Sequence, residues 1–160
     1  MTTHQDHLDI PPASPREVRI VFGGLMLALA LASLDQNIVS VALPQIVSDL
    51  GGLRHLSWVV TSFLVTSTVT TPLYGKLSDV YGRKPLFIIA IVIFLAGSCL
   101  CGLSRTMTEL VIFRGIQGLG AGGLMVLAQT TIADLVSPRE RGRYQGLFGA
   151  VFAFSSVAGP

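Results

Sequence analysis

The chain has 160 residues and a mass of 17.0 kDa, with 51% hydrophobic and only 12% charged residues. A mean hydropathy of +0.66 and a charged share about half that of soluble proteins exclude a soluble domain and a largely disordered chain. The net charge of +2 comes without a basic stripe interleaved with aromatic residues, so we expect no nucleic-acid partner. The composition predicts an all-α fold, a polytopic membrane helix bundle in contact with lipid.

The first 17 residues form a polar segment that contains three prolines. We expect residues 1–17 to be a disordered cytosolic tail, because prolines and polar residues at this density do not form a packed helix. The tail does not resemble a secretory signal peptide, since the apolar run after it continues over residues 20–43 and further apolar runs follow.

Five apolar segments have or approach the roughly 20 residues that a helix needs to cross a bilayer. We predict spans over residues 20–43, 56–74, 85–103, 110–132 and 144–160, in a membrane domain of residues 18–160. Pro44 is expected to end the first span. The fifth stops at Pro160 without a terminating signal, which suggests a fragment of a longer protein.

The second and fourth spans are expected to face other helices more than lipid. The second has eight Ser and Thr hydroxyls within 19 residues, and the fourth has five glycines between Gly115 and Gly123. Gly118 and Gly122 form a GxxxG pattern, which allows two helix backbones to approach closely.

The distribution of Lys and Arg predicts the orientation of the spans. Eight of these residues lie in the tail and in segments 75–84 and 133–143, whereas the segments on the opposite side have only Arg54 and Arg105. Positive residues collect on the cytoplasmic side, so we expect a multi-pass protein of the cell membrane with a cytosolic N-terminus. The connections are too short for a globular domain.

Two ionisable residues lie within the predicted spans, at a cost of about 2.5 to 3.5 kcal/mol each on insertion scales. Asp35 is about 12 Å below the outer end of the first span, and Arg114 about 6 Å below the outer end of the fourth. A long arginine side chain spans this difference, so both charges are predicted to share one water-filled cavity. They form either a proton and cation site or a buried ion pair that only fixes packing.

The segment of residues 75–84 combines basic residues with an acidic residue and two glycines. An ordinary cytosolic loop would explain Lys76, Arg83 and Lys84, but not Asp79 or the glycines. Glycines permit a tight turn, and Asp79 can approach a helix N-terminus or a basic group.

From these residues the chain is identified as resembling the N-terminal part of a major facilitator superfamily transporter, most similar to the fourteen-spanner drug:proton antiporter branch. The motif between spans two and three matches at Gly75, Leu77, Asp79, Gly82, Arg83 and Lys84. The first-span signature l-D-x-t-i-v-n-v-A-L-P is similar to residues 34–44, which include Asp35, and the fourth-span pattern R-x-x-q-G-x-g matches Arg114, Gln117, Gly118 and Gly120. The antiporter motif of the fifth span fits Gly146, Gly159 and Pro160, with Ser155 in place of a usual glycine.

The resemblance implies two six-helix halves around a central cavity, with the C-terminal half missing from this chain. It implies proton-driven efflux of a small hydrophobic, probably cationic substrate, with Asp35 and Arg114 in proton coupling and Asp79 and Arg83 in a cytosolic gate. No cofactor other than the proton gradient is implied.

Two alternatives stay open. The first is a sugar or metabolite symporter on the same fold, and the second is a non-transporting five-helix membrane scaffold if 160 residues are the whole product. The sequence has no nucleophile and base arrangement and no metal-ligand cluster, so we expect neither an enzyme nor a metal site.

Overall fold

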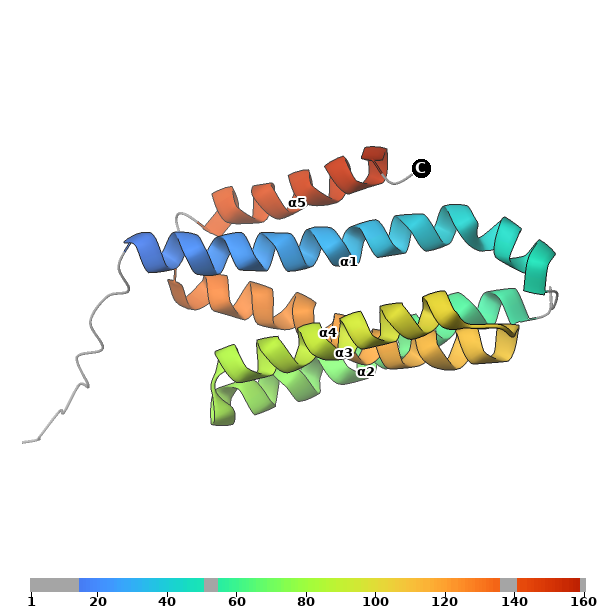
Figure 1. Cartoon of the computed structure of the whole chain (residues 1–160). Helices are drawn as coiled ribbons and strands as arrows, with labels where there is room; N and C mark the ends of the chain where they lie inside the picture. The colour runs from blue at the N-terminus through green and yellow to red at the C-terminus, as the bar shows by residue number, and fades with distance from the viewer. Residues whose placement is uncertain (1–14, 51–54, 136–140, 159–160) are drawn as a thin grey trace, which may run out of the picture.

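A computed structural model describes residues 15–50, 55–135 and 141–158, and within these ranges all regular structure is helical. The helices follow in the order α1 (Pro15–Leu50), α2 (Leu56–Tyr81), α3 (Arg83–Leu103), α4 (Met107–Leu135) and α5 (Arg141–Ala158). They lie side by side, as Figure 1 shows. The predicted all-α bundle is confirmed. Residues 1–14 of the predicted tail lie outside the described residues.

Four helical segments are long and apolar enough to cross a membrane. They are Phe22–Ala42, Leu56–Tyr81, Arg83–Leu103 and Met107–Asp134. The apolar part of α5 is shorter and covers Gln145–Ser155. The four long segments correspond to the first four predicted spans, and they present many large apolar side chains on the outside of the bundle, as a helix bundle in lipid requires.

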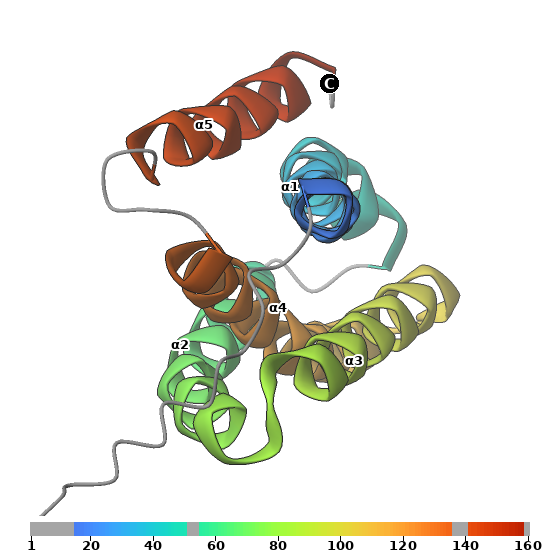
Figure 2. The ribbon, with the colours of Figure 1, turned by 90° about the vertical axis from the view of Figure 1, so that its left-hand side faces the viewer.

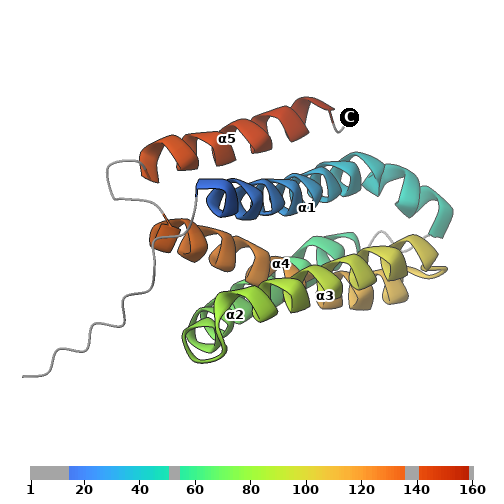
Figure 3. The ribbon, with the colours of Figure 1, turned by 60° about the vertical axis from the view of Figure 1, so that its left-hand side comes forward.

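Two helices extend beyond the spans predicted for them. Pro44 does not end the first helix, because α1 continues to Leu50 with the proline inside it. Proline removes one backbone hydrogen bond and crowds the preceding turn, which bends a helix without always ending it. The last turns of α1 bend in Figure 3. The second helix also continues past residue 74 to Tyr81, so most of the segment expected to be a loop is helical.

Helix α4 occupies the centre of the arrangement. It packs most extensively against α2 and α3 and less extensively against α1, while α5 packs chiefly on α1. Figure 2 shows α4 between α2 and α3 on one side and α1 on the other. A core of buried apolar residues joins these helices, with Phe63, Phe94, Leu124 and Leu127 among its members. The polar side chains of α4 are therefore enclosed on several sides.

Glycines bring α4 close to both of its main neighbours. A Cβ at Gly118 would stand 2.6 Å from the carbonyl oxygen of Phe63 on α2, and one at Gly122 would meet the carbonyl of Ser67. On the α3 side, a Cβ at Gly120 would be 2.5 Å from the backbone nitrogen of Phe94. No other residue fits at these contacts without a shift of backbone. The predicted close packing of the fourth span is confirmed.

The hydroxyls of α2 have two roles. Most of them donate to carbonyl oxygens one turn back in their own helix. Two reach α4, since Ser62 donates to the carbonyl of Val111 at 3.0 Å and Thr71 to that of Gly122 at 3.5 Å. Part of the predicted contact between polar helices is therefore made by hydrogen bonds between α2 and α4.

Candidate functional site

Asp35 and Arg114 form an ion pair inside the helix bundle. One nitrogen of Arg114, Nη1, lies 3.0 Å from Asp35 Oδ2 and joins α4 to α1. The Arg114 side chain is 2% exposed and that of Asp35 is 17% exposed. The prediction that these two charges share one site is confirmed in position, because they are in direct contact.

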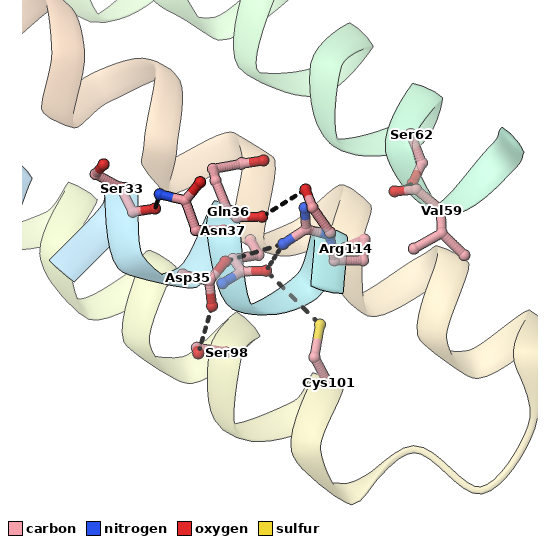
Figure 4. A network of polar contacts seen from close by, with 11 residues as sticks. Ser33, Asp35, Gln36, Asn37, Val59, Ser62, Ser98, Cys101 and Arg114 are labelled. Carbon is pink, nitrogen blue, oxygen red and sulfur yellow. Dashed lines mark hydrogen bonds and ion pairs between the residues drawn. The ribbon is translucent and has the colours of Figure 1, made fainter. Parts of the chain in front are cut away.

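Three further side chains complete the polar network around this pair. Ser98 on α3 donates to Asp35 Oδ1 at 3.1 Å, so the two carboxylate oxygens are bound by two different helices. Gln117, one turn beyond Arg114, accepts from Arg114 Nη1 at 2.8 Å and from the Cys101 thiol at 3.7 Å. Figure 4 shows Asp35 between Ser98 and Arg114, with Cys101 nearby. The network thus connects α1, α3 and α4.

Arg114 also rests on an aromatic ring of α2. Its Cζ lies 4.4 Å from the centroid of the Phe63 ring, which is within the range of a cation–π contact. Two donors in the network, Arg114 Nε and Gln117 Nε2, are buried and have no partner among the described residues. Buried unpaired donors are costly, so the network keeps donor capacity beyond what this arrangement uses.

A cavity of about 280 Å³ lies beside the network, between α1, α2 and α4. Its wall is mainly apolar, with hydroxyls and one amide added. The residues lining it are Leu29, Ala32, Ser33, Gln36, Phe63, Leu64, Ser67, Thr68, Thr71, Ala121, Gly122, Leu124 and Met125. Ser33 and Gln36 flank Asp35 in α1, so the carboxylate stands at the edge of this cavity. An apolar cavity with few polar groups is typical of a small-molecule site.

The second predicted motif joins α2 to α3. Gly82 is the single residue between the two helices and has φ 85°, a backbone conformation that favours glycine. The turn sets Arg83 at the start of α3, where its Nη2 lies 2.7 Å from Asp134 Oδ2 in the last turn of α4. The predicted tight turn is present at Gly82, whereas Gly75 lies inside α2 and faces open space.

The remaining motif residues divide between helix contacts and the surface. Gln117, Gly118 and Gly120 all lie where α4 touches another helix or the polar network. Leu77, Asp79 and Lys84 are exposed. Gly146 is also exposed, with open space around it. The other fifth-span motif positions, Gly159 and Pro160, lie outside the described residues.

Sequence reasoning missed three residues that the structure places in these sites. Asp134 was treated as part of a cytosolic segment, although an acid at the end of a span beside basic residues could have marked it. Ser98 carries no signal that separates it from other small polar residues. Cys101 was expected only to pack, but its thiol donates to the amide that holds Arg114.

Comparison with known proteins supports the resemblance. The Major Facilitator Superfamily family model matches residues 25–160. Multidrug resistance protein 3 of Bacillus subtilis is 45% identical over 153 residues, which is 96% of this chain and 30% of that protein. Efflux pump dotC of Dothistroma septosporum is 42% identical over 153 residues, or 96% of this chain and 26% of that protein. MFS-type efflux pump LUC4 of a Fusarium species is 40% identical over 152 residues, covering 93% and 27%.

The chain spans less than a third of the length of these relatives. The match includes the ion pair, the cavity wall and the Gly82 turn, because all of these lie within residues 25–160. Four membrane-length helices agree with a multi-pass membrane protein. The chain therefore belongs to the Major Facilitator Superfamily, a family of transporters and not of enzymes.

Proposed function

We propose that this chain is the N-terminal part of a proton-coupled transporter that exports small hydrophobic cations across the cell membrane by antiport. Efflux is supported by the names of the relatives, among them a multidrug resistance protein and efflux pumps. The single observation that carries proton coupling is the contact of 3.0 Å between Asp35 and Arg114 at the edge of an apolar cavity.

The charges of this pair give a reason for exchange. With Asp35 ionised, the pair is neutral, and a cation in the cavity meets a carboxylate that is still 17% exposed. With Asp35 protonated, Arg114 leaves an uncompensated positive charge beside the cavity, which repels a cation in a medium of low dielectric constant. Proton and cation therefore exclude each other, which is the requirement for antiport.

The partners of Arg114 allow it to stay in place through both states. When Asp35 takes a proton, Arg114 keeps its hydrogen bond of 2.8 Å to Gln117 and its contact with Phe63. The protonated carboxyl can in turn donate to Ser98 Oγ, which now donates to it. The network thus accommodates either charge state by redirecting hydrogen bonds, without moving a helix.

A second site is proposed as the cytosolic gate. The Arg83–Asp134 pair connects the start of α3 to the end of α4, with side chains 26% and 56% exposed. An exposed pair is weak enough to open and close during a transport cycle. Asp79, exposed two residues before the end of α2, is available to contact a part of the transporter that this chain does not include.

The extent of the whole protein and its orientation can be tested directly. The relatives are more than three times as long as the matched chain, so we expect the native protein to have an intact mass several times 17.0 kDa. A native mass of 17.0 kDa would favour the scaffold alternative. A tag at the N-terminus should be cleaved by protease only in inside-out vesicles, and cleavage in right-side-out cells would reverse the orientation.

The decisive test measures protons released when a cation binds to the full-length transporter in weakly buffered detergent. Tetraphenylphosphonium should release protons from the wild type and from Glu109→Gln, which removes an exposed carboxylate at the start of α4. Asp35→Asn should release none and should support no pH-driven transport in proteoliposomes. Proton uptake with the substrate would indicate symport instead, and release undiminished in Asp35→Asn would remove Asp35 from the mechanism.

A further inference from the structure

Phe63 is shared by the cavity and the polar network. Its ring carries Arg114 at 4.4 Å, and the same side chain lines the cavity between α1, α2 and α4. Only 8% of the residue is exposed. Every molecule that fills the upper part of this cavity therefore touches the residue on which Arg114 rests.

The backbone of Phe63 is held in place by α4. A Cβ at Gly118 would be 2.6 Å from the Phe63 carbonyl oxygen and 3.1 Å from its Cα, so the two helices are in direct backbone contact here. The main chain of Phe63 cannot retreat when the cavity fills. Only its side chain can respond, by rotating about its own bonds, and that rotation changes the contact with Arg114.

The cavity wall offers a cation few places to bind. No charged side chain lines it within the described residues, and Phe63 is the one aromatic residue among those that do. The face of an aromatic ring carries negative electrostatic potential and attracts organic cations, most strongly where water is excluded. A hydrophobic cation in this cavity therefore finds its best electrostatic partner in the ring that also holds Arg114.

We propose that Phe63 determines specificity for organic cations and transmits their binding to Arg114, an inference that rests on the proposed antiport function. The substrate cation takes a share of the ring and repels the nearby guanidinium. Arg114 is then driven from Phe63 toward Asp35, which stabilises the ionised carboxylate and releases its proton. When a proton returns to Asp35, Arg114 settles back on the ring and the substrate is expelled.

The charge of the ligand separates this role from simple packing. We compare binding of tetraphenylphosphonium and of neutral triphenylphosphine oxide to the full-length transporter, in the wild type, Phe63→Leu and Phe63→Trp. Phe63→Leu should weaken binding of the cation about five- to thirtyfold, as expected for a desolvated cation–π contact. It should change binding of the neutral compound less than twofold, and Phe63→Trp should restore cation binding. Equal loss for both compounds would overturn the proposal.

Fluorinated phenylalanines at position 63 provide a version of the test that preserves shape and folding. Each added fluorine weakens the negative potential of the ring, so the affinity for the cation and the protons released per cation bound should fall stepwise. No trend with fluorination would overturn the role of Phe63 while leaving the antiport function intact. A wild-type protein that releases no proton on binding the cation would instead overturn the antiport function itself.

Discussion

Two arginine–aspartate pairs join α4 to its neighbours, and their surroundings differ far more than their geometry. The buried pair, Asp35–Arg114, has side chains 17% and 2% exposed, whereas the exposed pair, Arg83–Asp134, has side chains 56% exposed at Asp134 and 26% at Arg83. The distances, 3.0 and 2.7 Å, are nearly equal. Distance alone therefore does not decide what an ion pair contributes to this protein.

The surroundings fix the energetic role of each pair. The buried pair is held by Ser98 and Gln117, so removing one partner leaves a charge inside the bundle with no compensation. The exposed pair is hydrated and loses little when one partner is removed. The first is suited to a step that must exclude stray ions, and the second to a contact that forms and breaks in each cycle.

The largest effect is expected from Arg114→Leu, which leaves Asp35 ionised and unpaired. We expect a loss of about 3 kcal/mol in the free energy of unfolding, measured by denaturation in mixed micelles at neutral pH. The double variant Asp35→Asn with Arg114→Leu should recover most of this stability, because no charge is left stranded, yet it should not couple transport to protons. A double variant as unstable as Arg114→Leu would mean that the arginine acts through packing alone.

Gly97→Val is expected to have the next largest effect, by pushing α3 away from the buried pair. A Cβ at Gly97 would lie 2.6 Å from the Cα of Gln117, and both contacting atoms belong to regular helices. Overpacking of this kind costs about 1 to 3 kcal/mol. Gly102→Val, on the same helix but in open space, is the matched control and should leave the unfolding midpoint nearly unchanged. Equal effects of the two variants would contradict the close contact at Gly97.

A smaller effect is expected from Ser98→Ala, which removes one of the two hydrogen bonds to Asp35. Hydrogen bonds between membrane helices contribute about 0.6 kcal/mol on average, and up to about 1.7 kcal/mol. Losing a donor to the ionised carboxylate favours its protonated form, so the pH at which cation binding is half-maximal should rise. Ser98→Thr should return the profile to that of the wild type, and an unshifted profile in Ser98→Ala would exclude a positioning role.

The sequence was sufficient to predict much of the buried pair because its signals are strong. A charge within an apolar span needs a partner, and helical rise placed Asp35 and Arg114 at depths that an arginine side chain connects. Glycine spacing likewise predicted the contact at Gly118. These conclusions depend on one helix at a time, or on an obligatory pairing of two.

Other features depended on information that a single sequence does not contain. Pairing of Arg83 with Asp134 requires that the start of α3 lie beside the end of α4, which follows from packing of the whole bundle. Ser98 is one small hydroxyl among many, and only the position of Asp35 gives it a role. The continuation of α1 through Pro44 reflects tertiary support that outweighs one lost backbone hydrogen bond.

The smallest stability effect, and the sharpest contrast with the buried pair, is expected from Arg83→Ala. Since the exposed pair is hydrated, the free energy of unfolding should fall by less than about 1 kcal/mol, and the difference should shrink as salt is raised. Transport by the full-length protein should fall more than stability does, if this pair holds the gate. Exchanging the charges in Arg83→Asp with Asp134→Arg should restore transport in part, whereas either single change should not. A loss of stability as large as that of Arg114→Leu would show that burial does not distinguish the two pairs.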